Sequence, residues 1–523
     1  MNRGRRVPPT IGYGFREVAQ RCAGNACILH GLQCWTFGDV DRASDDLAAG
    51  LVASGIECGD RVALLCSNGA AFVGAYLGIV KAGAAVVPLN LRLHPKELAF
   101  ILSDAGVKAM LCADELLGLA RHAAIEALEV PIRATLGGAS AGDEMTVQGL
   151  AQPGGALCVA SPDAEDLAAI LYTSGTTGRP KGAMLTHGNL VANAQAVADA
   201  LAYRDGEDRV LVVLPIFHAF AATVGVLAPL LRGCACIPVA RFEPGLVSEA
   251  VAVHEATVFL GVPSMYQLLL RAGEALRGKW MSVRCCVSGG AAMPTALLQS
   301  FEERFGIPIL EGDGPTECSP VTCVNPLDGA RKLGSVGLPL RGVEMTIRNS
   351  SGAALPVGEL GEVCVRGPNV MKGYWRLPEA TSEAFFGCWL RTGDLGYQDA
   401  DGYFYLVDRL KDLIITDGAN VYPRMIEEVL YRHPGVIEAA VVGEPHRLHG
   451  EVPVAHVVKS PAAAELTERD LRAWCRDSLG VHEIPRRFVI RDELPKNAAG
   501  KILKRELRRA GEVERGVDLR LDV

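Results

Sequence analysis

The sequence has few of the features that mark nucleic-acid-binding, secreted or zinc-binding proteins. Its 523 residues carry 52 Lys and Arg against 60 Asp and Glu, a formal net charge of −8, so there is no global positive field to hold nucleic acid. None of its 16 cysteines belongs to a CxxC pair or has a histidine at zinc-ligand spacing. We therefore expect buried, reduced thiols in a cytoplasmic protein with no nucleic-acid partner.

Targeting and membrane-spanning segments are also lacking. The start, MNRGRRVPPTIGYGF, is basic, but no apolar run follows it, so we predict no signal peptide. Residues 211–231 are uncharged and long enough for a transmembrane helix, yet Pro215 and Pro229 interrupt them and His218 lies near their middle. We predict a buried strand, loop and helix here, and no integral membrane span.

What the chain does contain is an alternation of short apolar runs and helical patterns. Residues 70–83 are predicted to form a helix that ends at Gly83, between the predicted strands 60–68 and 84–90. Strand, helix and strand in this order predict a parallel sheet with helices on its faces. The pattern recurs around residues 108–113, 167–174, 208–215 and 256–263.

The pattern changes after about residue 334. Short strands with frequent glycines predict a small, distorted β-barrel, and helix–strand alternation returns after Asp408. Thr467 and Asp470 form a predicted capping box at the start of a helix. The predicted fold class is α/β, with a large N-terminal domain of two helix-flanked sheets plus the barrel over residues 1–408. A mobile α+β domain is predicted over residues 412–523, with a hinge near 409–411.

The strongest local motif is Y-T-S-G-T-T-G-R-P-K-G, residues 172–182, directly after a predicted strand. Its glycines let backbone N–H groups approach an anion, and its hydroxyls and Lys181 add donors for phosphate oxygens. It lacks the GK[ST] ending of a Walker A loop. The composition alone indicates a phosphate-binding loop, with a surface turn as the alternative.

This loop resembles the signature loop of the adenylate-forming superfamily, which includes acyl-CoA synthetases, firefly luciferases and peptide-synthetase adenylation domains. The resemblance covers nearly the whole chain, because further motifs follow in the family's order: LPIFHAFA (214–221), VSGGAAMP (287–294), EGDGPTE (311–317), WLRTGDLG (389–396), DRLKDLIITDGANVYP (408–423) and PKNAAGKILKR (495–505).

The resemblance implies a site for ATP and Mg²⁺. Glu317 corresponds to the carboxylate that binds magnesium, a metal that takes one or two carboxylates plus substrate oxygens. Thr316 is expected to contact the α-phosphate, and Thr173 to approach the metal. Asp394 is expected to accept hydrogen bonds from the ribose hydroxyls, with Arg409 in support.

Lys501 corresponds to the family's lysine that bridges the substrate carboxylate and the α-phosphate, where an ammonium offsets the repulsion of two anions. The catalytic residues implied are thus Lys501, Thr316, Glu317 and His218. The remaining nucleotide contacts implied are Ser174, Gly175, Thr176, Thr177, Gly178, Lys181, Gly290, Ala291, Glu311, Asp313 and Gly314.

Two residues are expected to serve the second half of the reaction. Lys411 matches the family's hinge position, where a few residues absorb the dihedral changes of a domain rotation. Gly418 is expected to line the pantetheine tunnel of coenzyme A after that rotation, where a side chain could block the tunnel.

One position departs from the family. An aromatic residue usually stands where this chain has Asp313, and a carboxylate provides no stacking face for adenine. A polar role for Asp313 is favoured, because an unpaired carboxylate in a nucleotide pocket is costly.

The predicted activity is ligation of a carboxylic acid to coenzyme A through an acyl-adenylate, releasing AMP and pyrophosphate. The expected pocket segments 218–225, 260–266 and 288–293 are apolar and offer no acidic group for an ammonium, which favours a medium- or long-chain fatty acid. An aromatic acid or a dicarboxylate would be the next choice, with Arg232 as the nearby cation for a dicarboxylate. Two functions of a different class compete with ligation: a catalytically silent adenylate-binding regulator and a luciferase-like oxygenase. A homodimer is possible.

Overall fold

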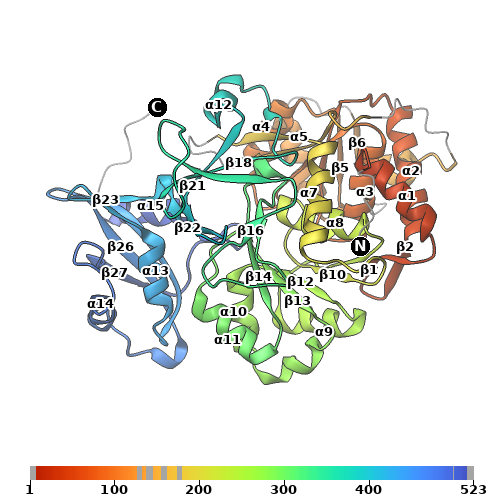
Figure 1. Cartoon of the computed structure of the whole chain (residues 1–523). Helices are drawn as coiled ribbons and strands as arrows, with labels where there is room; N and C mark the ends of the chain where they lie inside the picture. The colour runs from red at the N-terminus through yellow and green to blue at the C-terminus, as the bar shows by residue number, and fades with distance from the viewer. Residues whose placement is uncertain are drawn as a thin grey trace.

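The computed structural model of the chain describes residues 8–126, 132–136, 145–154, 162–173, 179–498 and 500–514. Figure 1 shows a large N-terminal domain of two helix-flanked sheets and a smaller antiparallel sheet, followed by a small α+β domain that contains β23 to β27. This arrangement confirms the predicted α/β fold class.

The two large sheets are built mainly from parallel neighbours. In one the strand order is β19 (Gly373–Tyr374), β9 (Lys181–Thr186), β8 (Leu167–Thr173), β4 (Ala85–Pro88), β3 (Arg61–Leu65), β5 (Ala109–Cys112), β6 (Ile132–Thr135) and β7 (Met145–Thr146). In the other it is β16 (Leu338–Pro339), β15 (Cys323–Val324), β14 (Ile309–Asp313), β13 (Cys285–Ser288), β12 (Val258–Gly261), β10 (Arg209–Val212), β11 (Ala235–Pro238), β1 (Ala26–His30) and β2 (Gln33–Thr36).

Helices pack on these sheets and surround the small domain's sheet. Those of the described residues are α1 (Ile11–Arg21), α2 (Phe37–Ala53), α3 (Ala70–Lys81), α4 (Pro95–Ala105), α5 (Leu117–Glu126), α6 (Val147–Leu150), α7 (His187–Ala200), α8 (Ala228–Leu230), α9 (Pro244–His254), α10 (Pro263–Arg271), α11 (Thr295–Phe305), α12 (Pro378–Glu383), α13 (Pro423–Tyr431), α14 (Glu468–Arg476) and α15 (Lys504–Glu514).

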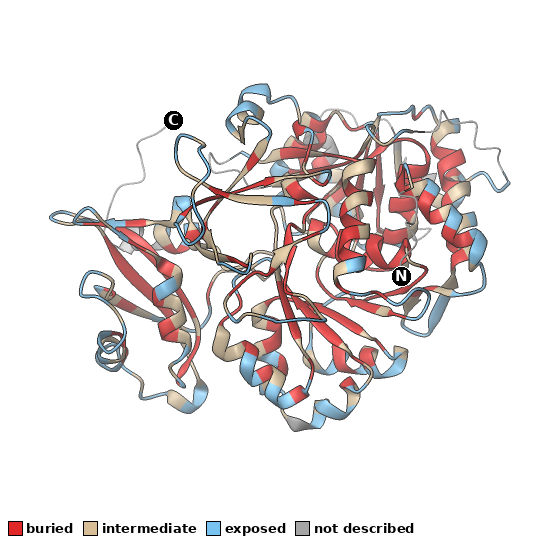
Figure 2. Cartoon of the chain, in the orientation of Figure 1, coloured by how far each residue is buried: buried red, intermediate tan, exposed pale blue. Residues whose placement is uncertain are grey.

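The central parallel strands are apolar along their whole length. Every residue of β12 and β13 is buried, as expected where helices cover both faces of a sheet. Figure 2 shows this burial concentrated on the strands, with exposure on the outer helix faces. The predicted helix over 70–83 ends at Lys81, and Gly83 follows with φ of +78°, a conformation that suits glycine.

The uncharged segment 211–231 is the predicted strand, loop and helix. It contains the end of β10, a π-helix over Ala221–Leu227 and the short α8. Across the described residues, none of the helices combines the length and apolarity that a bilayer crossing needs.

The glycine-rich region, for which a small, distorted β-barrel was predicted, forms an antiparallel sheet of five strands. Its strands are β17 (Glu344–Arg348), β18 (Gly361–Arg366), β21 (Trp389–Gln398), β20 (Phe385–Phe386) and β22 (Phe404–Arg409), with β22 paired to β21. The short 3₁₀ helix Leu410–Asp412 leads from β22 into the small domain.

The small domain is a sheet covered by helices. Its strands are β24 (Ala419–Val421), β23 (Ile414–Thr416), β26 (Gly450–Lys459), β25 (Val436–His446) and β27 (Arg487–Arg491). The predicted capping box of α14 is present, because Thr467 and Asp470 exchange side-chain and backbone hydrogen bonds. Leu471 and Cys475 of this helix are buried against the sheet.

The described cysteines are all free thiols, and most are buried. Burial raises the pKa of the Cys66 thiol to about 12, which makes it unreactive. Cys34, Cys58 and Cys388 differ from the prediction, because they are exposed. In the part of the chain that the structure describes, no group of three or more His, Cys, Asp or Glu residues is placed to hold a metal ion.

Candidate active site

The expected ribose-binding carboxylate lies near the junction of the two domains. Asp394 of β21 and Arg409 of β22 are register partners, and Arg409 Nε lies 3.2 Å from Asp394 Oδ1. Asp394 is 8% exposed. The ion pair therefore compensates a buried charge and fixes the orientation of the carboxylate.

Lys501 reaches this place from the small domain. Its turn is closed by two hydrogen bonds of 2.9 Å, from Lys501 N to Asn497 Oδ1 and from Asn497 N to Lys501 O. A Cβ added to Gly500 would stand 3.0 Å from Val262 Cγ2, so the turn packs directly against the large domain. The structure thus shows the two domains closed on each other at Lys501.

The electrostatics of this junction set the state of the lysine. Desolvation, then the charge of Arg409, lowers the pKa of Lys501 to about 8, while Asp394 and Asp313 oppose this shift. Two cations and two carboxylates therefore face one another within one small volume. Such a cluster suits the binding of anionic groups, because the cations are already held in place.

Three other basic side chains of the C-terminal segment form ion pairs within the small domain. Their ion pairs are Lys496 with Glu438, Lys504 with Glu427, and Arg508 with Asp412. Lys501 differs from these neighbours, because it faces the large domain whereas they stabilise the small one.

Asp313 is the last residue of β14 and belongs to the same cluster. Desolvation, then the nearby charge of Asp394, raises the pKa of Asp313 to about 6, while Arg409 and Lys501 oppose the rise. The carboxylate that replaces the family's aromatic residue thus has charged neighbours of both signs. This environment agrees with a polar role for Asp313.

Glu311 lies two residues earlier on β14 and deeper in the domain. It is 2% exposed, and its carboxylate accepts a hydrogen bond of 3.0 Å from Met293 N. Burial raises the pKa of Glu311 to about 7. The structure therefore places Glu311 behind the site, supporting the 288–293 segment, rather than in an open position for a nucleotide.

Thr316 and Glu317 stand on a short 3₁₀ helix, Thr316–Cys318, that follows β14. The chain before it runs very close to a neighbouring strand of backbone: a Cβ on Gly314 would lie 1.8 Å from Pro320 O. Only glycine can be accommodated where the two backbone segments come so close together. This close contact fixes the position of the 3₁₀ helix that carries Thr316 and Glu317.

The Glu317 side chain has a partner that the sequence did not reveal. Tyr374 Oη donates to Glu317 Oε1 over 2.8 Å, and Lys181 Nζ lies 5.2 Å from the centre of the Tyr374 ring. Tyr374 follows Glu317 by 57 residues, and no local pattern distinguishes it from other tyrosines. Only the pairing of β19 with β9, which the sequence does not show, places Tyr374 next to Glu317 and Lys181.

The two ends of the predicted phosphate loop lie side by side. Thr173 ends β8, Lys181 begins β9, and the two residues are register partners. Ser174, Gly175, Thr176, Thr177 and Gly178 lie outside the described residues. The strands thus bring Thr173 and Lys181 together at the two ends of this loop.

The predicted acid-binding segments meet next to the Lys501 turn. A Cβ on Gly290, whose φ is +76°, would stand 3.9 Å from Val262 Cγ1, so Gly290 lies near one methyl group of Val262 and Gly500 lies near the other. Burial lowers the pKa of His218 to about 4, and its Nε2 has no hydrogen-bond partner among the described residues. His218 is therefore neutral at pH 7.

Gly418 is not brought to this cluster. It occupies the turn between β23 and β24 with φ of +79°, and a Cβ there would meet nothing within 4 Å. In Figure 1 β23 lies at the outer edge of the small domain. Lys411, in contrast, lies in the 3₁₀ helix between the domains, where burial and Arg409 lower its pKa.

A second contact between the domains was also missed. Glu428, on α13, lies near Thr295 N, the first residue of α11: burial raises the pKa of Glu428, and this backbone group opposes the rise. Pro294 precedes α11 and supplies no side-chain cap. An acidic side chain of the small domain therefore lies at the N-terminus of a helix of the large domain, where the helix dipole favours negative charge.

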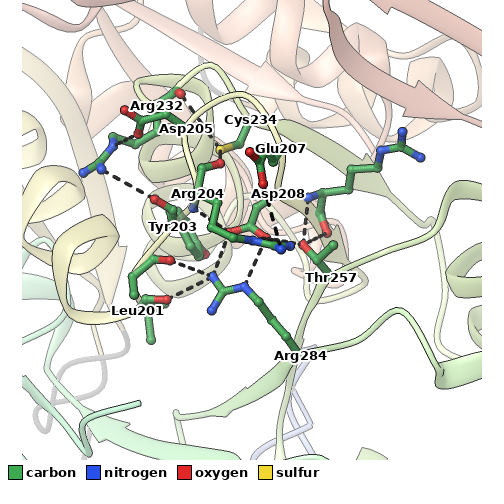
Figure 3. A network of polar contacts seen from close by, with 12 residues as sticks. Leu201, Tyr203, Arg204, Asp205, Glu207, Asp208, Arg232, Cys234, Thr257 and Arg284 are labelled. Atoms are coloured by element: carbon green, nitrogen blue, oxygen red, sulfur yellow. Dashed lines mark hydrogen bonds and ion pairs between the residues drawn. The ribbon is translucent and has the colours of Figure 1, made fainter. Parts of the chain in front are cut away.

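The nomination of Arg232 as a cation for a dicarboxylate substrate is wrong. Figure 3 shows Arg232 pointing at Asp205, with Nε 2.5 Å from Asp205 Oδ1, and Nη1 lies 2.8 Å from Asp199 Oδ1. Its neighbour in the same view is Asp208: although burial raises the pKa of this group, hydrogen bonds from Arg284 and other donors bring it to about 2. Arg232 is thus neutralised within a structural network.

Comparisons with known proteins agree with these observations. The sequence profile described as AMP-binding enzyme matches residues 15–375, and that of the AMP-binding enzyme C-terminal domain matches residues 425–501. A feruloyl-CoA synthase from Amycolatopsis sp. is 39% identical over 493 residues, covering 92% of this chain and 95% of that protein.

Two further relatives extend the range. A long-chain-fatty-acid–CoA ligase from Bacillus subtilis (strain 168) is 35% identical over 501 residues, covering 90% of this chain and 89% of that protein. Among solved structures, the anthranilate CoA ligase AuaEII in complex with anthranoyl-AMP has a TM-score of 0.91 at 27% identity, covering 98% of this chain and 99% of that one.

Proposed function

Because the chain belongs to the AMP-binding enzyme family, as an acid–CoA ligase that works through an acyl-adenylate, we propose specific roles for its residues and a class of acid. In the first half-reaction an oxygen of the acid's carboxylate attacks the α-phosphorus of ATP, and the bond to the bridging oxygen breaks as pyrophosphate leaves. In the second, the thiol of coenzyme A attacks the acyl carbon and AMP leaves.

The observation that carries the proposal is the cluster of Lys501 and Arg409 around Asp394. Adenylation brings a carboxylate against a triphosphate, and an ammonium between them offsets their repulsion and stabilises the charge that moves to pyrophosphate. Asp394 holds Arg409 in place and serves as acceptor for the ribose hydroxyls. Positioning and charge neutralisation supply most of the catalysis.

The residues present fit magnesium. Glu317 is partly exposed on its 3₁₀ helix, and its Oε1 is held by Tyr374, which fixes the carboxylate in one plane. A single protein carboxylate with substrate phosphate oxygens is a usual Mg²⁺ environment. Glu317, with Thr173 nearby at the end of β8, would hold the ion, which supplies charge neutralisation for the phosphates.

For the acid we favour an aromatic monocarboxylate over the fatty acid predicted from the sequence. A Cβ on Gly290 would stand 3.9 Å from Val262 Cγ1, and a Cβ on Gly289 would stand 3.3 Å from Phe220 Cζ. The half-buried Phe220 ring therefore packs against the bare backbone of Gly289, within the expected acid-binding segments. An aromatic acid can stack on this ring, a contact that an alkyl chain does not make.

Two further features support this choice. A second carboxylate on the substrate finds no charge partner in His218, which is neutral, or in Arg232, which is already paired. Feruloyl and anthraniloyl groups, the acyl groups named for two relatives, are both aromatic. The fatty acid remains the competing class, since a relative at 35% identity is named for it.

The test is a screen of AMP release with coenzyme A, ATP and Mg²⁺. It compares a hydroxycinnamate, a benzoate, octanoate, palmitate and malonate by kcat/KM. Aromatic acids are expected to have the highest kcat/KM, and Gly289→Ala is expected to reduce it because the added methyl group would displace the Phe220 ring. Higher kcat/KM for a fatty acid would refute the aromatic assignment, and no pyrophosphate with any acid would favour a silent adenylate-binding regulator. Light emission with luciferin tests the oxygenase function directly.

The domain boundaries belong to this proposal. We place the large domain at residues 1–408, the lid at 412–523 and the hinge at 409–411, around the 3₁₀ helix that joins them. In the closed arrangement Lys501 is at the site and Gly418 is distant, so a rotation must exchange them before coenzyme A reacts. The predicted cytoplasmic location and homodimer stay predictions.

Lys411→Pro is expected to slow thioester formation about tenfold or more while changing adenylation much less. Proline fixes φ near −65° and restricts the preceding residue, so it removes the freedom that a rotation at this position needs. Single-turnover assays with and without coenzyme A measure the two steps, and acyl-adenylate should accumulate. Lys411→Ala, which keeps the freedom of rotation, is the control; equal slowing of both steps by proline would place the pivot elsewhere.

Asp313→Tyr is expected to weaken ATP binding about three- to tenfold, or about 0.5–1.5 kcal/mol. The change removes an acceptor from a cluster in which Arg409 and Lys501 depend on carboxylate neighbours. ATP titration of the variant measures the effect, and Asp313→Asn separates loss of charge from loss of shape. Tighter binding by the tyrosine variant would show instead that only a stacking contact had been lost in this chain.

A further inference from the structure

We propose that Tyr374 is a positioning residue that fixes the metal-binding carboxylate and the phosphate-loop lysine relative to each other. The inference rests on the proposed function of Glu317 and Lys181. The Tyr374 phenol donates to Glu317 Oε1 over 2.8 Å, and the face of the same ring lies 5.2 Å from Lys181 Nζ. One side chain thus contacts both groups that are assigned to the phosphates and the metal.

The backbone around Tyr374 makes the same connection. Tyr374 pairs with Ala183 in β9, the strand that Lys181 begins, and Met371 N donates to Glu317 O over 2.7 Å. The segment 371–374 therefore links the strand after the phosphate loop to the 3₁₀ helix that carries Glu317. The positions of Glu317 and Lys181 are therefore both fixed by hydrogen bonds to the same short segment.

The chemistry of the phenol suits this role. A donor on Oε1 leaves Oε2 of Glu317 for a cation, and it prevents the carboxylate from rotating away; partners of this kind tune metal ligands in many proteins. The ring attracts the Lys181 ammonium without neutralising it, because an aromatic face carries no net charge. Lys181 thus keeps its full charge for phosphate.

ATP binding measured by calorimetry without any acid substrate tests the role apart from turnover. With Mg²⁺ present, Tyr374→Phe is expected to bind ATP about tenfold more weakly than the parent, the usual scale for loss of a metal ligand's partner. With EDTA in place of Mg²⁺, the variant is expected to bind ATP within about twofold of the parent, since the ring beneath Lys181 is retained.

A matched control is available in Tyr403. Its phenol also donates to a protein oxygen, Ala330 O, and Lys332 Nζ lies 4.6 Å from the centre of its ring, but it lies just before β22 and away from Glu317. Tyr403→Phe removes a similar hydroxyl and is expected to change neither titration. A further check is Glu317→Gln: in that background Tyr374→Phe should add less than about twofold.

Two results would overturn the proposal: unchanged Mg²⁺–ATP affinity in Tyr374→Phe, or equal weakening with and without Mg²⁺, which a general packing role predicts. Thermal unfolding checks that the variant folds, and if it does not, Tyr374→Trp keeps a ring under Lys181 and is held to the same two outcomes. Acid-dependent ATP–pyrophosphate exchange by the parent is measured separately. Its absence with every acid would contradict the proposed function and leave the binding comparison valid.

Discussion

Lys501→Ala is expected to slow acyl-adenylate formation about 10²–10³-fold, the scale on which removal of one preorganised charge acts in other enzymes. The lysine stands at the closed domain junction with Arg409 and two carboxylates, and it is the group that the small domain contributes to the site. Without it, no ammonium lies between the acid's carboxylate and the α-phosphate, and their repulsion is offset less. Acid-dependent ATP–pyrophosphate exchange measures this step.

Thioester formation from a supplied acyl-adenylate is expected to remain largely intact in the same variant, because in the proposed two-conformation scheme Lys501 leaves the site when the lid rotates. Lys504→Ala is the matched control, since Lys504 lies three residues away and pairs with Glu427 within the small domain. Equal loss of both half-reactions in Lys501→Ala would contradict the two-conformation scheme.

The pH profile provides a second check on Lys501. Its pKa of about 8 means that the ammonium is present below that pH and is lost as the pH rises through it. Adenylation kcat/KM, which reports groups of the free enzyme, is therefore expected to fall above about pH 8. Lys501→Arg keeps its charge at high pH and should abolish this alkaline limb, whatever its effect on the maximal rate.

Gly314→Ala is expected to destabilise the protein by about 3 kcal/mol and to abolish most activity. The added Cβ would stand 1.8 Å from Pro320 O and 2.9 Å from Thr322 N, both backbone atoms that cannot turn aside. Relief requires the chain to separate on both sides of the 3₁₀ helix that carries Thr316 and Glu317. Denaturant unfolding and ATP–pyrophosphate exchange measure the two effects.

Gly245→Ala is the control for that substitution. Gly245 lies in the first turn of α9, and a Cβ there meets nothing within 4 Å, so alanine should be neutral or slightly stabilising in a helix. If Gly314→Ala unfolded with parental stability, the close approach of the two backbones would not be a constraint on this site.

The strands that carry the site could be predicted, because strands covered on both faces must be apolar throughout. Runs such as those of β12 and β13 are distinct in the sequence for this reason. The residues at their ends, such as Asp313, were then found by motif. The π-helix at Ala221–Leu227 was predicted only as a helix, since apolar residues on all sides leave no periodicity to distinguish the two forms.

Contacts between distant segments could not be predicted. Tyr374 acts on a carboxylate 57 residues away, and Glu428 lies at the N-terminus of a helix in the other domain, so neither has a local pattern. Arg232 shows the opposite error: its apolar surroundings in the chain suggested a free cation, but Asp199 and Asp205 meet it only in the folded protein. Whether a charged side chain is free to bind a substrate depends on its ion pairs, and these form only when the chain folds.

The position of Glu428 at the N-terminus of α11 bears on how freely the lid can be exchanged between enzymes. A lid grafted from a relative would have to bring an acidic side chain to the same end of α11, or the closed arrangement would lose a favourable interaction with the helix dipole, at a cost of about 0.3–1 kcal/mol. That cost lowers the population of the closed arrangement about two- to fivefold. The lid of this protein thus depends on the large domain that it closes on, and chimeras should be designed with α11 and α13 taken from the same parent.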